Sequence, residues 1–309
     1  MYNKMKCSKC SSTAFVLLHY ANLALCKKHF VEYYEKKLQT SCEKQKIILP
    51  GEHILVAVSG GKDSIAMLYA LKKVCKGNKL TALFINLGIP EYSNDSERVV
   101  KKACQKIEVP LIVYNLKNEI GKTLVEAAKK RRKICSACGT VKRYVMNKVA
   151  NDINADVIAT GHTLYDTAAF IFRNFMLGNI NEMKKLVPRT STLKELKLIG
   201  KAKPLYEFSE YENLLYCIAN NLDYIDYDCP FSEDTPIVEW KRFLFQFDKK
   251  HPGSILKFVR YYPKNINLFF GNSNIEKELT QDEMKIHFCS KCGMPTTQDV
   301  CSFCKLTRE

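Results

Sequence analysis

Short apolar runs alternate with longer, helix-like segments through the middle of this chain. Runs of strand length cover residues 53–58, 80–86, 111–115, 156–160 and 198–200. Segments with the helical spacing of apolar residues cover 63–75, 94–107, 119–132, 140–153, 164–177 and 209–220. Because buried strands that alternate with helix-length spacers form right-handed crossovers, the pattern predicts an α/β fold. We expect a Rossmann-like, mainly parallel sheet with helices on both faces.

The two ends of the chain differ from this middle part. Residues 31–46 are amphipathic and residues 233–263 are basic and helix-like, whereas cysteine clusters lie at residues 1–30 and 289–304. We predict four parts. They are a zinc knuckle at 1–30, the α/β domain with its linker helix at 31–232, a basic helical RNA-binding region at 233–286 and a zinc ribbon at 287–309.

A glycine-rich turn links the first strand-like run to the next helix-like segment. Its residues are Ser59, Gly60, Gly61, Lys62, Asp63 and Ser64. Glycines allow the backbone to close around an anion, and the amino end of the following helix offers it free N–H groups. The kinase-type phosphate loop would need a glycine where Val56 stands. The turn instead resembles the PP-loop of the N-type ATP pyrophosphatases, so we predict that it binds ATP.

A second polar turn, Gly161-His162, follows another predicted strand. Ligands of parallel sheets bind beyond the carboxyl ends of the strands, so we expect both turns at one ATP-binding edge. An alternative interpretation of His162 is a packing residue at the start of the next helix.

The composition points to a polyanionic partner. The formal net charge is +16, and such an excess of Lys and Arg favours nucleic acid. Hydrophobic residues make up 46% of the chain, which supports a sizeable core. No apolar stretch is typical of a secretion signal or a membrane span, so we expect a cytoplasmic protein. Candidate RNA contacts include the basic run 129–133, basic side chains of the 233–263 segment, and Tyr261 and Tyr262 as stacking platforms.

Fourteen cysteines in such a chain favour metals or redox chemistry over disulfides. Two sets have the spacing of closed, structural zinc sites. The N-terminal set is Cys7, Cys10, Cys26 and His29, and the C-terminal set is Cys289, Cys292, Cys301 and Cys304.

A third arrangement, Cys135 and Cys138, has no second pair nearby. Spacing alone leaves a redox dithiol, half of a zinc site and part of an iron–sulfur site open. Cys229, in a Cys-Pro turn, is the candidate third ligand, and three cysteines would leave one iron of a cubane cluster open.

Together these motifs resemble the tRNA 2-thiouridine synthetase family, the TtuA-type group that includes the cytosolic thiouridylase subunit. The resemblance covers nearly the whole chain. It rests on the N-terminal knuckle, S-G-G-K-D-S, the segment 87–93, C-S-A-C-G with the following Lys142-Arg143, G-H-x-x-x-D, the Cys-Pro, the segment 251–253 and the C-terminal ribbon.

The resemblance implies an ATP-dependent sulfurtransferase that adenylates a tRNA uridine at O2 and replaces that oxygen with sulfur. It implies that the PP-loop and Mg²⁺ hold ATP, that Cys135, Cys138 and Cys229 ligate a [4Fe-4S] cluster, and that two Zn²⁺ are structural. Lys142, Asp166 and Lys62 would act at the reacting centre. The sulfur donor would be a ubiquitin-like carrier or free sulfide, and the protein would be a homodimer.

One departure from the family pattern concerns the G-H-x-x-x-D motif. Tyr165 and Thr167 stand where the family usually has acidic residues, and Asp166 is retained. Two alternatives therefore stay open: a PP-loop enzyme that uses a cysteine persulfide without a cluster, and a non-catalytic zinc-ribbon protein that binds tRNA.

Overall fold

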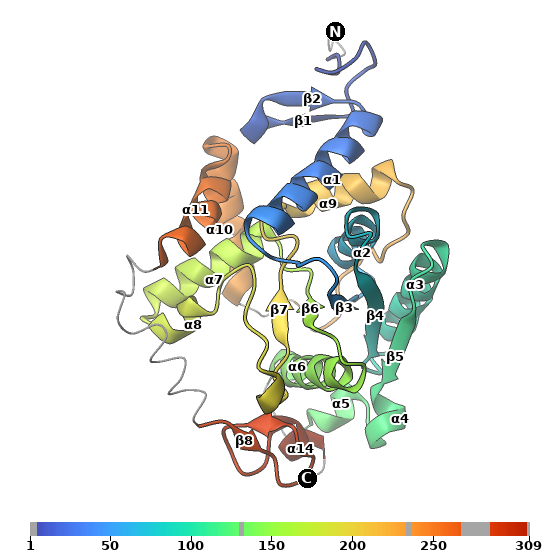
Figure 1. The fold of residues 1–309 in the computed structure, drawn as a ribbon, viewed down its shortest axis with the longest axis vertical. Coiled ribbons are helices and arrows are strands. Elements are labelled where there is room, and N and C mark those ends of the chain that lie inside the picture. The colour runs from blue at the N-terminus through green and yellow to red at the C-terminus, as the bar shows by residue number, and fades with distance from the viewer. Residues whose placement is uncertain (1–4, 130–132, 233–235, 267–284, 308–309) are drawn as a thin grey trace.

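The computed structural model describes residues 5–129, 133–232, 236–266 and 285–307. Its centre is a five-stranded, entirely parallel sheet in the order β5-β4-β3-β6-β7 (Figure 1). The strands are β3 (His53–Ala57), β4 (Lys79–Asn86), β5 (Leu111–Asn115), β6 (Val157–Ala159) and β7 (Gly200–Ala202). The predicted fold class is confirmed, and β6 lies between β3 and β7 although it follows β5 in the sequence.

Helices cover both faces of the sheet because alternate strand residues point to opposite faces. One core layer packs Ile54 and Val56 against α1 (Lys27–Lys44), α2 (Lys62–Val74), α3 (Tyr92–Lys106) and α9 (Glu210–Ala219). The other packs Leu55 and Ile158 against the second helical layer. That layer consists of α4 (Leu116–Ile120), α5 (Leu124–Ala127), α6 (Ile134–Asp152) and the C-terminal α14 (Ser302–Thr307).

A separate helical group packs at the β7 side of the molecule. It contains α7 (Leu164–Met176), α8 (Ile180–Lys184), α10 (Pro236–Lys250) and α11 (Ser254–Lys264). Buried residues of α7, such as Leu164 and Ala168, share a small core with Leu244 of α10 and Val259 of α11. The positive φ of Gly253 (84°) separates α10 from α11 within the basic segment.

The small terminal modules lie at opposite ends of the molecule (Figure 1). The N-terminal module is an antiparallel hairpin of β1 (Val16–Leu18) and β2 (Leu23–Leu25), joined by a 3-10 turn (His19–Ala21). The C-terminal module pairs β8 (His287–Phe288) with β9 (Pro295–Thr296).

Three predicted elements differ from the structure. The helix predicted at 119–132 is two short helices, because Gly121 ends α4 in the left-handed conformation and Thr123 caps α5; residues 130–132 lie outside the described part. The helix predicted at 140–153 begins earlier, at Ile134. The prediction missed its first turns because apolar residues do not recur there with helical spacing. The last strand is Gly200–Ala202, because Leu193 and Leu198 pair in the turn before it.

Candidate nucleotide and sulfur site

The PP-loop lies at the carboxyl end of β3, the central strand of the sheet. Gly60 has a φ of 89°, and a Cβ there would lie 3.2 Å from Ser96 of α3, so both conformation and space favour glycine. Helix α2 begins at Lys62, directly after Gly61. The Ser64 hydroxyl donates to the Gly61 carbonyl (2.9 Å) and accepts from the Ser59 N–H (3.1 Å). The loop therefore presents hydroxyls and a helix amino end to an anion.

Lys62 and Asp63 lie on the first turn of α2 and pair with each other, with 3.1 Å between Lys62 Nζ and Asp63 Oδ2. The other carboxylate oxygen of Asp63 accepts from Asn213 Nδ2 of α9 (2.9 Å). Burial raises the pKa of Asp63, while Lys62 and Asn213 oppose that shift. Sequence reasoning did not single out Asn213, because no local motif marks it.

A cavity of about 120 Å³ opens between the PP-loop and the segment that follows β4. Ser59 lines it on one side, Ile89 and Tyr92 line it on another, and Lys142 reaches it from α6. Burial raises the pKa of Tyr92, and Lys142 and Cys229 both lie close enough to influence that pKa as well. The cavity thus joins the predicted nucleotide loop to the neighbourhood of the predicted cluster ligands.

The three candidate cluster ligands lie around the start of α6. Cys135 and Cys138 are in its first turns, and Lys142 follows on the same helix face because the spacing is close to one and two turns. Cys135 Sγ donates to the carbonyl of Phe231 (2.8 Å), two residues beyond Cys229. All three thiols are half-buried.

The three thiols do not form a single-ion site. Within the described residues, the sets of His, Cys and carboxylate ligands that come within 4.8 Å of one another are the two terminal ones. In a cubane each thiolate binds a different iron, so the thiols need not converge on one point.

Both terminal sets fit tetrahedral zinc. Zn–S bonds of about 2.3 Å require S···S edges of about 3.8 Å. The Sγ atoms of Cys10 and Cys26 are 3.9 Å apart, and those of Cys292 and Cys301 are 3.7 Å apart. Cys7 and Cys26 approach His29 Nδ1 at 3.3 and 3.4 Å. Burial alone would raise the pKa of Cys289. Hydrogen bonds from the backbone of Cys301, Lys291 and Cys292 instead lower this pKa to about 6.

Gly161 and His162 lie at the carboxyl end of β6, beside the PP-loop. A Cβ on Gly161 would lie 3.6 Å from the Ser64 backbone. His162 Nδ1 is 2.9 Å from Thr160 Oγ1, and His162 is exposed at this end of the sheet. Its imidazole can therefore offer a hydrogen bond to a ligand there.

Asp166 lies on the first turn of α7 and has two structural partners. It accepts from the Thr163 N–H (3.0 Å) in a capping box and pairs with Lys241 of α10 (2.7 Å). Burial alone would raise its pKa, but Lys241 lowers it below the usual value, so Asp166 is ionised. Tyr165, the departure from the family pattern, donates to Asp248 of α10 (2.9 Å). Both side chains thus attach α10 to the start of α7.

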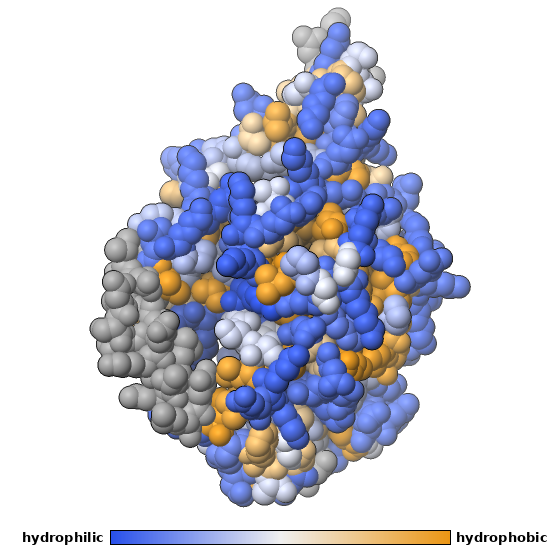
Figure 2. Space-filling model, in the orientation of Figure 1, coloured by the Kyte–Doolittle hydropathy of each residue, from blue (hydrophilic) through white to orange (hydrophobic). Residues whose placement is uncertain are grey.

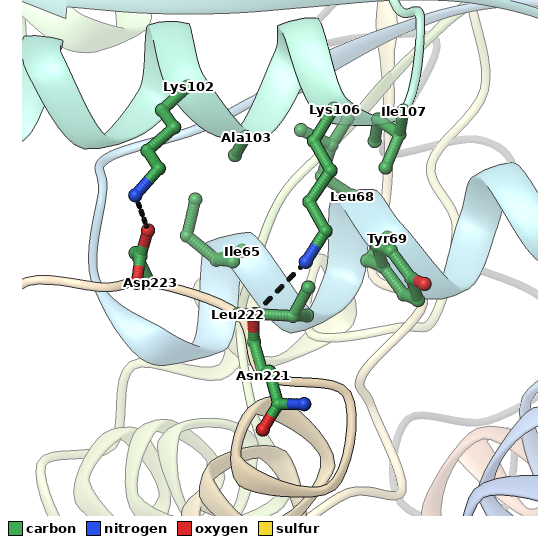
Figure 3. Close-up of a pocket in the computed structure, with 10 residues that line it drawn as sticks. All are labelled: Ile65, Leu68, Tyr69, Lys102, Ala103, Lys106, Ile107, Asn221, Leu222 and Asp223. Atoms are coloured by element: carbon green, nitrogen blue, oxygen red, sulfur yellow. Dashed lines mark hydrogen bonds and ion pairs between the residues drawn. The ribbon is translucent and has the colours of Figure 1, made fainter.

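Two other features of the described residues do not belong to this site. A surface cavity of about 290 Å³ lies between α2 and α3, where Lys102 pairs with Asp223 and Lys106 donates to the Asn221 carbonyl (Figure 3). Its lysines already have partners. The prediction of Tyr262 as a stacking platform is wrong, because its ring is buried and its hydroxyl donates to the Met183 carbonyl (2.7 Å).

Comparison with known proteins identifies the family. A family model described as a PP-loop domain matches residues 31–229, and one described as the N-terminal LIM domain of 2-thiouridine synthetase TtuA matches residues 6–31. A tRNA-5-methyluridine(54) 2-sulfurtransferase of Pyrococcus horikoshii is 42% identical over 97% of this chain and 93% of its own length. The chain belongs to the tRNA 2-thiouridine synthetase family.

Further matches cover the C-terminal cysteine set and the full chain. A family model of the four-cysteine zinc finger domain of RecR matches residues 286–305. The Xenopus laevis cytoplasmic tRNA 2-thiolation protein 1 is 26% identical over 98% of this chain and 87% of its own. The solved structure of the U34-tRNA thiolase NcsA from Methanococcus maripaludis, with its [4Fe-4S] cluster, has a TM-score of 0.79 at 26% identity. It covers 100% of this chain and 97% of its own.

The visible surface of the molecule is mainly polar. Figure 2 shows hydrophilic side chains over much of one face, interrupted by smaller hydrophobic areas. Among the described residues, every helix is too short or too polar to cross a bilayer.

Proposed function

We propose that this protein is an ATP-dependent tRNA uridine 2-sulfurtransferase. The observation that carries the proposal is the cavity that joins Ser59 of the PP-loop to Lys142, on the helix whose first turns hold Cys135 and Cys138. A nucleotide loop that shares a cavity with the helix of the candidate sulfur ligands suits a reaction in which an activated carbonyl is attacked by sulfur.

ATP binds with its β- and γ-phosphates on the loop from Ser59 to Ser64, and Mg²⁺ would offset the negative charge of those phosphates. The α-phosphate faces the cavity. Uridine O2 attacks the α-phosphorus, and pyrophosphate leaves. Lys62 and Lys142 stabilise the negative charge that develops on the phosphoryl oxygens. Gly161 and His162 lie beside the loop and complete the ATP site.

Sulfur then replaces the activated oxygen. Sulfide forms a bond to C2 of the adenylated uridine, and the C2–O2 bond breaks as AMP leaves with the former O2. Cys135, Cys138 and Cys229 would hold the [4Fe-4S] cluster, which supplies an iron position without a protein ligand for sulfur. Asp166, ionised beside His162, orients a proton or a water near the reacting base.

Other features of the proposal concern organisation. The division into parts at 1–30, 31–232, 233–286 and 287–309 assigns a structural Zn²⁺ to each terminal part. The basic 233–286 region contacts tRNA. Sulfur arrives from a ubiquitin-like carrier or as free sulfide, the protein is a homodimer, and it works in the cytoplasm.

Of the two uridines named among the relatives, we propose position 54. Relatives named for 5-methyluridine 54 reach 42%, 34% and 33% identity, whereas the structurally similar U34 thiolase has 26%.

Nucleoside mass spectrometry tests the proposal. The anaerobically reconstituted protein is incubated with ATP, sulfide and tRNA that carries 5-methyluridine at position 54 but no 2-thiouridine, and the RNA is then digested into fragments. We expect a gain of sulfur in place of oxygen at uridine 54, together with AMP formation. Thiolation at uridine 34 would overturn the assigned position, and ATP use without any thiolation would overturn the function.

A further inference from the structure

A group of cationic side chains lies at the carboxyl ends of β6 and β7, beyond the residues assigned above. Lys201 is in β7, Lys203 follows it, and Arg143 reaches the same region from α6. Lys201 is paired in register with Ile158 of β6, whose side chain belongs to the core under α6. Because opposite residues of paired strands point to the same face, Lys201 points toward α6.

Lys203 is the most buried member of this group, with 9% of its surface exposed. Its Nζ donates to the carbonyl of Val187 (2.9 Å). Burial, together with the charge of Lys201, lowers the pKa of Lys203 to about 8. Burial and the charge of Arg143 likewise lower the pKa of Lys201. Lys201 therefore lies close enough to both Lys203 and Arg143 for these like charges to repel.

These charges are not neutralised within the described part of the chain. No carboxylate there lies within 4.0 Å of the Lys201, Lys203 or Arg143 nitrogens. Buried Lys37 differs, because it pairs with Glu212 at 2.7 Å. A buried ammonium without a counter-charge is costly, so its retention beside a second lysine and an arginine points to an anion that binds there.

We propose that Lys201, Lys203 and Arg143 bind one phosphate of the RNA backbone next to the uridine that reacts. This inference rests on the proposed function. The PP-loop follows β3, two strands away from β7, which corresponds to about 10 Å at the usual strand spacing. The cationic group is therefore separate from the loop that holds the pyrophosphate of ATP.

The test measures binding without chemistry. The variants are Lys203→Met, Lys201→Gln and the double variant, and the matched control is Lys76→Gln. Lys76 is exposed and precedes β4, at the amino-terminal edge of the sheet. The dissociation constant of an unmodified tRNA transcript is measured over a series of salt concentrations. The affinity for a non-hydrolysable ATP analogue is measured by calorimetry.

We expect the double variant to bind the transcript several-fold more weakly, with a slope of log K against log salt that is smaller by about 1. ATP-analogue affinity stays as in the control. Weaker ATP-analogue binding with an unchanged salt slope would assign the group to ATP phosphate and overturn the inference. No change in either the ATP-analogue affinity or the salt slope would also overturn it. If Lys203→Met fails to fold, Lys201→Gln alone, at a half-buried position, tests the inference through the same two measurements, the tRNA salt slope and the ATP-analogue affinity. Because no thiolation is measured, failure of the proposed function appears separately in the nucleoside experiment.

Discussion

Asn213 of α9 donates from Nδ2 to Oδ1 of Asp63, at the start of α2, across 2.9 Å. The two residues are 150 positions apart in the sequence. Asn213 is fully buried, and Tyr34 of α1 donates to its Oδ1 (2.7 Å), which sets the orientation of the amide. A linker helix and a distant helix thus hold the carboxylate that pairs with Lys62 of the PP-loop.

We expect Asn213→Leu to weaken ATP binding. The substitution leaves Oδ1 of Asp63 and the Tyr34 hydroxyl without their hydrogen-bond partner, which costs about 1–3 kcal/mol of unfolding free energy. Calorimetry with a non-hydrolysable ATP analogue and chemical denaturation measure the two effects. Asn220→Leu, at the half-buried carboxyl-terminal cap of the same helix, is the control. Equal ATP affinity in both variants would show that Asp63 needs no support from Asn213.

Cys229→Ser should abolish the cluster while the fold remains. The Cys-Pro turn supplies one of the three proposed thiolates, and Cys135 contacts the same turn through Phe231. Iron and acid-labile sulfide are measured after anaerobic reconstitution. Cys75→Ser, at a half-buried thiol after α2, is the control and should retain both. Equal iron and sulfide in the two variants would contradict the ligand assignment, and sulfur transfer that persists without iron would favour a persulfide.

The C-terminal zinc module should stabilise α6. Phe303 of α14 stacks on Tyr144 of α6, with ring centroids 3.7 Å apart and an interplanar angle of 2°. Phe303→Ala should therefore cost about 3–5 kcal/mol. Thermal unfolding together with zinc analysis measures this effect. Chelation of zinc should lower the melting temperature of the native protein. The decrease should be smaller in Phe303→Ala, because the module packs less tightly on α6 in this variant. Equal shifts in both proteins would argue against this coupling.

Lys203 should make stability depend on pH in the alkaline range. Its pKa is about 8 in the folded protein and about 10.5 when solvated, so the unfolded state binds more protons between these values. The unfolding free energy should therefore rise with pH from about 8 to about 10.5, by up to about 3 kcal/mol. Denaturation of the native protein and of Lys203→Met across this range isolates the contribution. The variant should be more stable near pH 7, with a difference that shrinks as pH rises; a constant difference would contradict a buried ammonium.

Much of the architecture could be predicted from local patterns. The alternation of strand-like and helix-like segments located β3, β4, β5 and β6 and overlapped β7 only at Gly200, and the glycine turn located the amino end of α2. The zinc sets were recognisable because two residues three positions apart bring their side chains together within one turn of chain. The same reasoning missed the first turns of α6, where apolar periodicity is absent, and it placed Tyr262 on the surface.

The sequence by itself determined the elements, the phosphate-binding turn and the two terminal metal sets, because each depends on residues within a few positions or one short loop. Only the tertiary structure decided which distant groups meet. The order β3-β6-β7 places His162 and Lys203 on the same edge of the sheet as the PP-loop, and the packing of α9 brings Asn213 to Asp63. These contacts follow from how helices cover both faces of the sheet, and hydrophobic spacing along one segment carries no information about its neighbours in space.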